Sequence, residues 1–318
     1  MQRISKPLNR RHVLRYCLAA LGAAVLPAPL MRLRAAERAG ESADGLTPLR
    51  DGLSLLDAGG SNVLVCDTAQ GLVLVDSGAP DYSQRLMQTL DALHGNGVHT
   101  LFNTHWHAEQ CGANEAIGSG GATLIAHQKT WHHLATRYYL PHEQRYHEPL
   151  PKAALPTVTF HDKGSIEVGG QQIDYAALVQ PHTDADIYVY FREANVLAVG
   201  GAVGGDHDPE LDWYGGGWLG GRVNSLDALV ALADDDTLIV PAKGGVLNKA
   251  ALVAERDMTQ ALYDRALDLI RAGCSADCML QEGALEGLGR QWQDPQRFLY
   301  AVYKGMWAHH YNLAPNIL

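Results

Sequence analysis

The chain has 318 residues, 47% of them apolar, so it can bury a sizeable core in one large α/β domain or two small ones. Its formal net charge of −10 makes nucleic acid and anionic membrane surfaces poor candidate partners. The charge is uneven: residues 1–36 hold seven Arg or Lys and no acid, so the remainder carries −10 − 7 = −17.

The basic N-terminal segment has the layout of an export signal. Residues 9–15, Asn-Arg-Arg-His-Val-Leu-Arg, resemble the twin-arginine motif, and the apolar run that follows over residues 16–31 is short for a membrane span. We expect residues 1–36 to be a twin-arginine-type signal peptide that directs the protein to the periplasm, and residues 37–52 to be a linker. No clear small-x-small cleavage site follows, so an uncleaved membrane anchor and a cytosolic protein with a basic tail are open alternatives.

From residue 53 onwards, short apolar runs alternate with helical spacing, which predicts one α/β domain over residues 53–318. The His- and Pro-rich residues 141–156 are expected to form an exposed insertion near a pocket mouth, and the Gly-rich residues 206–221 a flexible rim. The predicted strands are 61–67 and 71–76 (a hairpin), 98–102, 123–126, 157–160, 166–168, 173–179, 187–191, 195–199 and 237–241; the predicted helices are 82–93, 128–139, 249–272, 277–288 and 295–310.

Two imidazoles, His105 and His107, lie on the loop after the strand 98–102, and alternate side chains on an extended loop can point toward one metal ion. The stretch Asn-Thr-His-Trp-His-Ala-Glu resembles the His-x-His-x-Asp-His signature of the metallo-β-lactamase superfamily, with Glu109 in place of the Asp and Gln110 in place of the last His. Asp76, in an Asp-Ser-Gly step, resembles the family's acid that braces the metal loop without binding the metal.

Two later stretches extend the resemblance. His182, in His-Thr-Asp-Ala-Asp, resembles the family's third ligand of the first metal, which precedes a strand in His-Thr-x-Gly-Asp. The next strand ends in Gly-Gly201, where the family has Gly-Asp with an Asp that bridges two metals. Pro-Ala-Lys-Gly, with Lys243, stands where the family has Pro-Gly-His-Gly. The resemblance therefore implies an intact first metal site and a degenerate second one.

The resemblance implies the four-layer αβ/βα sandwich of the superfamily. It also implies one Zn²⁺ per chain, held by His105, His107 and His182, because three neutral imidazoles with an open position are typical of catalytic zinc. They favour zinc over iron or manganese. We expect a hydrolase whose zinc-bound hydroxide attacks the carbonyl of a small-molecule ester, lactone, thioester or amide. Lys243 is expected to replace the missing cation and stabilise the oxyanion, and Glu109 to act as general base or orient the water.

Other interpretations stay open. Lys243 and Glu109 could instead form a buried ion pair that fills a second site unable to bind metal. The protein would then be a zinc protein without catalytic activity, which binds a small ligand or a periplasmic partner. A phosphoester is a less favoured substrate, because family members that cleave one use two metals. A rebuilt second site is the least favoured alternative, with these candidate ligands: Asp206, His207, Asp208 and Cys111.

The remaining histidines and cysteines carry weaker indications. Cys66 is expected to be buried in a strand, and Cys274 and Cys278 could form a disulfide in an oxidising compartment. Cys17 belongs to the presumed signal peptide. Four further histidines lie in or near the insertion and are not favoured as ligands: His132, His133, His142 and His147.

Overall fold

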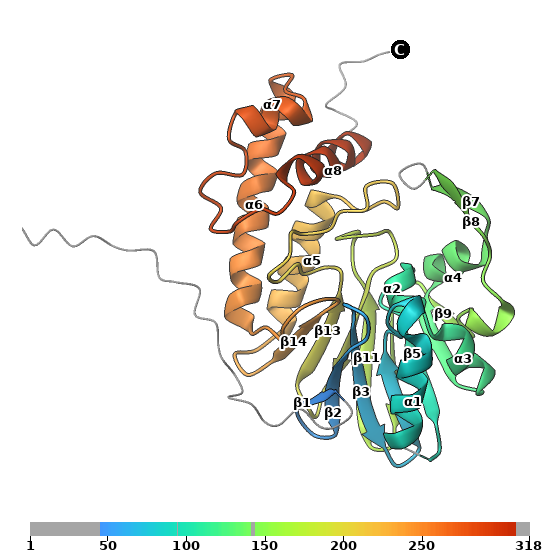
Figure 1. Ribbon diagram of the computed structural model, residues 1–318. Helices are drawn as coiled ribbons and strands as arrows, with labels where there is room; N and C mark the ends of the chain where they lie inside the picture. Colours follow the sequence, from blue (N-terminus) through green and yellow to red (C-terminus); the bar gives the residue numbers. More distant parts are fainter. Residues whose placement is uncertain (1–44, 94, 141–143, 310–318) are drawn as a thin grey trace, which may run out of the picture. The chain divides into compact units, whose positions relative to one another are not determined.

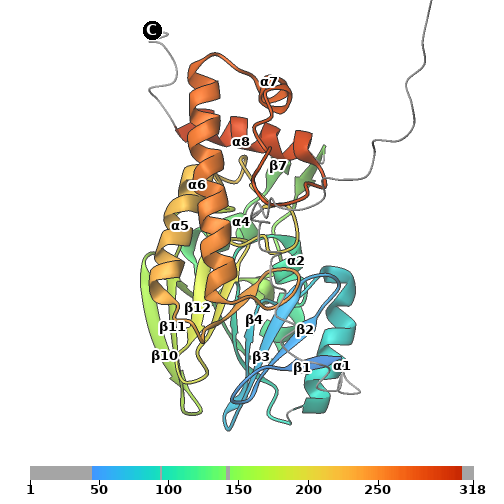
Figure 2. The same cartoon turned by 90° about the vertical axis from the view of Figure 1, so that its left-hand side faces the viewer.

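Two β-sheets lie face to face between layers of helices (Figures 1 and 2). The computed structural model describes residues 45–93, 95–140 and 144–309. The predicted signal peptide, with Cys17, and residues 37–44 of the predicted linker lie outside the described residues. The layers confirm the four-layer αβ/βα sandwich expected from the resemblance.

The first sheet changes from antiparallel to parallel at β4, and this change brings the ends of β4 and β5 to one edge. The predicted hairpin is confirmed as the antiparallel pair β3 and β4. In spatial order the strands are β1 (Leu46–Pro48), β2 (Leu53–Asp57), β3 (Asn62–Thr68), β4 (Gly71–Val75), β5 (Val98–Phe102), β6 (Thr123–His127) and β9 (Val158–Phe160).

The second sheet is antiparallel except for its last pair, β13 and β14, which run parallel. Side chains such as Phe191 and Ile187 from this sheet meet Phe102 and Val75 from the first in a fully buried core. The strands in spatial order are β10 (Lys163–Val168), β11 (Gln171–Ala177), β12 (Ile187–Phe191), β13 (Val196–Gly200) and β14 (Leu238–Pro241).

Helices cover both outer faces. α1 and α3 bury apolar side chains against the first sheet, and α5 and α6 lie side by side against the second (Figures 1 and 2). The α-helices are α1 (Ser83–Leu93), α2 (Ala108–Cys111), α3 (Asn114–Ser119), α4 (Gln128–Ala135), α5 (Leu219–Leu232), α6 (Lys249–Arg271), α7 (Ala276–Gln281) and α8 (Pro295–His309); two 3-10 turns are η1 (Pro80–Tyr82) and η2 (Lys152–Ala154).

Several elements differ from the expected ones. The first sheet begins with β1, inside the range assigned to the linker, because Leu46 is buried and pairs with β2. The helix expected over 128–139 ends at Ala135, and Tyr139 instead pairs with Tyr146 in a hairpin of β7 (Tyr138–Leu140) and β8 (Arg145–His147). α5 was not expected, and α7 is shorter than 277–288, because Gly283 adopts a positive φ of 68°.

The C-terminal helices form an apolar cluster of their own, in which α7 and α8 pack against the end of α6. A disulfide joins Cys274, which follows α6, to Cys278 in α7, the pairing that the sequence left possible. Cys66 is fully buried in β3, as expected, and burial raises the pKa of its thiol to about 12. Among the described residues, no helix combines the length and the apolar character that a membrane crossing needs.

Candidate metal centre

Asp76 holds the loop that carries the two motif histidines. It follows β4, with a φ of 64° and 3% exposure, and it accepts hydrogen bonds from Thr104 N at 2.7 Å and from Thr104 Oγ1 at 2.8 Å. Burial raises the pKa of Asp76 to about 8, although the Thr104 hydrogen bonds act to lower it. Asn103 Nδ2 donates to Gln110 O at 3.1 Å and closes the loop from its other end. Asp76 thus joins the end of β4 to the loop after β5 through Thr104.

Three imidazoles converge on one point from two distant loops. His105 and His107 come from the β5–α2 loop, and His182 from the loop between β11 and β12. One ring nitrogen of each lies within 4.8 Å of the others. The ring centroids are separated by 4.9 Å (His105–His107), 4.7 Å (His105–His182) and 4.8 Å (His107–His182). The structure thus brings together the three residues that the resemblance assigns to the first metal.

The second nitrogen of each ring meets an oxygen outside the cluster. Thr104 Oγ1 lies 3.0 Å from His105 Nδ1, and Asp212 Oδ2 lies 3.1 Å from His107 Nε2. Asp186 Oδ1 lies 3.4 Å from His182 Nδ1, and among the described residues neither atom forms a hydrogen bond. Such outer contacts orient metal-binding imidazoles and leave the other nitrogen free for an ion. The donor set therefore fits a three-imidazole zinc site.

The electrostatics of the rings differ. Burial lowers the pKa of His105 well below its usual value, and the other two imidazoles add to this effect. His105 is therefore neutral at physiological pH, which is the form that binds a metal. For His107, burial acts to lower the pKa, but the hydrogen bond and charge of Asp212 outweigh it, and the pKa is raised.

A pocket opens beside the three rings and is partly open to solvent. Lys243 lies in its wall with a side chain 30% exposed, and its Nζ is 3.0 Å from Glu210 Oε1. The other oxygen of Glu210, Oε2, is 3.7 Å from His182 Nε2. Glu109 also lines the pocket but is exposed on α2. The alternative of a buried Lys243–Glu109 pair is therefore wrong: the partner of Lys243 is Glu210.

The positions of the second site offer few donors. A Cβ on Gly201 would lie 2.1 Å from His182 Nδ1, so no side chain can start there without displacing that ring. Gln110 is 2% exposed and donates to Ser61 Oγ at 2.9 Å. Within the described ranges, the three histidines are the one group of potential ligands whose donor atoms lie close together.

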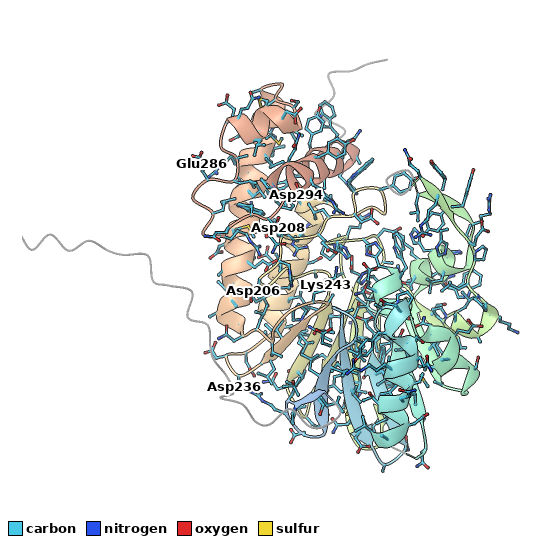
Figure 3. All side chains as sticks on the ribbon, in the orientation of Figure 1. Asp206, Asp208, Asp236, Lys243, Glu286 and Asp294 are labelled. Carbon is cyan, nitrogen blue, oxygen red and sulfur yellow. A yellow bond between two sulfur atoms is a disulfide. The ribbon has the colours of Figure 1, made fainter. Side chains whose placement is uncertain are left out.

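The other candidates for a second site lie outside the histidine cluster, although His207 and Asp208 line the same pocket. Cys111 is 5% exposed, and its thiol donates to His105 O at 3.5 Å. Asp208 accepts hydrogen bonds from Gln293 N and Asp294 N, both at 2.9 Å, and in Figure 3 it lies beside Asp294, between Lys243 and α8. Asp206 and His207 are exposed on the same loop.

The histidines of the insertion lie outside the cluster. His133 stacks on Trp106 and its Nε2 is 3.0 Å from Asp184 Oδ1, while His147 stacks on Tyr138. His132 is exposed. His142 lies outside the described residues.

Sequence reasoning missed three acids at the site. Asp186 ends the His-Thr-Asp-Ala-Asp stretch and accepts from His182 N and Thr183 Oγ1, so the final acid of that motif could have identified it. Glu210 and Asp212 belong to the loop expected to be a flexible rim. Asp212 instead ties this loop to His107 by a hydrogen bond, and it accepts a second hydrogen bond from Gly215 N within the loop. No local pattern could have paired residues 105 positions apart.

Comparison with known proteins agrees with this geometry. A family model described as the metallo-beta-lactamase superfamily matches residues 56–243, more than half of the chain. The chain is 25% identical over 199 residues to a metallo-beta-lactamase type 2 of Bacillus cereus, covering 62% of this chain and 72% of that protein.

Solved structures share the fold at lower identity. A metallo-beta-lactamase from Pontibacter korlensis has a TM-score of 0.56 at 20% identity and covers 68% of this chain and 98% of its own. The stereoselective inverting sec-alkylsulfatase Pisa1 from Pseudomonas sp. has a TM-score of 0.64 at 17% identity; it covers 86% of this chain, which spans about half (52%) of the sulfatase. With the family model matching from β2 to Lys243, the chain belongs to the metallo-β-lactamase superfamily.

Proposed function

We propose that the protein is an exported zinc hydrolase with one zinc ion per chain, acting on the carbonyl of a small-molecule ester, lactone, thioester or amide. The observation that carries this proposal is the cluster of His105, His107 and His182, whose donor atoms lie within 4.8 Å of one another in the wall of an open pocket. Zinc bound by three imidazoles supplies Lewis acidity, which acidifies water and polarises the bond to be cleaved.

A single ion is supported by the residues around the second position. Gly201 is packed against the His182 ring, the amide of Gln110 is hydrogen-bonded to Ser61, and Lys243 is a cation. A protonated lysine offers no lone pair to a metal ion. Two ions would need donors that these positions do not supply.

The pocket residues suggest how the chain assists hydrolysis. Lys243 would place positive charge near the substrate oxygen that becomes negative in the transition state. Two carboxylates compete for the role of general base: Glu109, expected from the sequence, and Glu210, whose Oε2 is 3.7 Å from His182 Nε2. The variants Glu109→Gln and Glu210→Gln separate them, because the loss of the base should lower kcat more than it changes KM.

The periplasm is the proposed location. Residues 1–36 resemble a twin-arginine signal peptide, and a disulfide between Cys274 and Cys278 is typical of an oxidising compartment. A small-molecule substrate is the proposed partner; the net charge of −10 argues against nucleic acid. Contact with the membrane is proposed only if the signal peptide is retained.

One observation favours a second candidate function, a zinc protein without turnover that binds a small ligand or a periplasmic partner. Glu210 neutralises Lys243 and extends toward His182, so part of the space for a substrate is filled by the protein itself.

Metal analysis and a substrate panel test the proposal. The protein, purified from its native compartment, is assayed for zinc per chain and for turnover of chromogenic esters, lactones, thioesters and a cephalosporin. His182→Ala is compared with His132→Ala, an exposed histidine outside the cluster. One zinc with turnover lost only in His182→Ala supports the hydrolase. One zinc without turnover supports the silent alternative, and no zinc or two zinc ions refutes the proposal.

A further inference from the structure

A buried ion pair lies behind the pocket, between α5 and α6. Arg222, at the start of α5, is 0% exposed, and its Nη2 donates to Glu255 Oε1 of α6 at 2.8 Å. Glu255 is itself 8% exposed. Removing two charges from water is costly, and further hydrogen bonds to the pair's remaining atoms offset part of that cost. Of these atoms, Arg222 Nε alone has no partner among the described residues. The partners of these further hydrogen bonds indicate what the pair does.

The guanidinium binds three backbone carbonyls from two segments of the site. Arg222 Nη1 donates to Gly201 O at 3.1 Å, to Glu210 O at 3.4 Å and to Pro181 O at 3.5 Å. Pro181 precedes the third imidazole, and Gly201 packs against that imidazole's ring. Only an arginine offers enough donors, in a planar fork, to reach these carbonyls and a carboxylate together.

The Glu255 carboxylate binds the same loop through two backbone N–H groups. Glu255 Oε1 accepts from Gly204 N at 2.7 Å, and Oε2 accepts from Gly205 N at 3.2 Å. Gly204 lines the pocket, so Glu255 holds the pocket wall in place. Arg222 holds the backbone beside His182. The family model ends at Lys243, so Glu255 belongs to a helix beyond the matched range.

We propose that Arg222 and Glu255 are positioning residues, which hold the His182 backbone and the loop 201–210 at a fixed separation and so tighten metal binding. The inference rests on the proposed function in taking His182 as a zinc ligand. Metal–ligand distances tolerate only about 0.2 Å. Greater mobility of the backbone on either side of His182 therefore weakens zinc binding without removing a ligand. α6 thus supports the site although none of its residues lines the pocket.

The test replaces the pair without leaving a lone buried charge. Arg222→Met/Glu255→Met keeps volume and apolar packing, a change that buried pairs often tolerate. The matched control is Arg256→Met/Asp227→Met, which removes a 3.0 Å ion pair between the same two helices with side chains 34% and 51% exposed. Zinc affinity is measured by chelator competition, coordination by the Co²⁺ absorption spectrum, and loop mobility by hydrogen exchange of residues 200–212 in the metal-free protein.

We expect the double variant to bind zinc about 10- to 100-fold more weakly, with a changed Co²⁺ spectrum and faster exchange in residues 200–212, while the control matches the wild type. A folded double variant with wild-type affinity and exchange overturns the inference. If it does not fold, Arg222→Lys replaces it, since lysine keeps the ion pair and loses the fork; wild-type behaviour of that variant also overturns it. Should the wild type bind no zinc, the proposed function fails, and the exchange comparison alone decides on the positioning role.

Discussion

Gly201→Ala should remove the metal site with a single methyl group. A Cβ at this position would lie 2.1 Å from His182 Nδ1, whereas ordinary contact begins at 3.4 Å, so the ring must retreat by more than an ångström. That is at least five times the roughly 0.2 Å that metal–ligand distances tolerate. The backbone itself accepts alanine, because Gly201 lacks the positive φ found at Gly200. Since changes outside the ligand set already cost about 10- to 100-fold in metal affinity, the loss of a ligand should cost at least as much.

Chelator competition with zinc measures this effect. Gly245→Ala is the control, because it follows β14, the strand next to the β13 that precedes Gly201, has no positive φ, and its Cβ would meet nothing within 4 Å. The variant Gly201→Asp should behave like Gly201→Ala and should not gain a second zinc. Zinc affinity of Gly201→Ala within threefold of the wild type would refute the reasoning, as would two zinc ions in Gly201→Asp.

Three further predictions concern the residues around the site. Asp76→Ala leaves the buried N–H of Thr104 without an acceptor, so urea denaturation should show the free energy of unfolding reduced by about 1–3 kcal/mol; an unchanged value would exclude the brace. Lys243→Ala should abolish turnover and leave one zinc per chain, and activity within a few-fold of the wild type would contradict its role. Burial raises the pKa of Cys66 to about 12 and that of Cys111 well above its usual value, so both remain thiols at pH 8, and mass spectrometry should find iodoacetamide adducts on them only after unfolding.

Strands bounded by polar residues were predictable, whereas elements decided by tertiary contacts were not. The bounds predicted for the strand 98–102 are the observed ones, because the apolar run that indicates the strand lies within those residues. The end of α4 depends on Tyr139 pairing with Tyr146, which the helical spacing before it does not reveal. α5 was hidden by two glycines: a Cβ on Gly220 would lie 2.4 Å from the ring of Trp218, and one on Gly221 2.4 Å from Val179 O. Close packing selects glycine there, although glycine alone indicates a loop.

The same distinction applies to the site. His105 and His107 were predictable because their spacing places both on one short loop, and His182 because a second motif surrounds it. Their supporting acids were harder to find. Asp212 reaches His107 from a loop whose composition indicates mobility, and the hydrogen bond that holds it has no counterpart in local sequence.

The interpretation of Lys243 as a substitute for the second cation now depends on Glu210. Together the two side chains carry no net charge, so Lys243 can act as a cation only in a state where Glu210 has moved away. Glu210 is the more exposed partner, at 57% against 30%, and an ion pair so exposed is worth only about 0–1 kcal/mol. A substrate oxygen that approaches Lys243 can therefore displace the carboxylate at little cost. The contact that favours the second candidate function is therefore weak, and the proposed hydrolase would need only the movement of the Glu210 side chain.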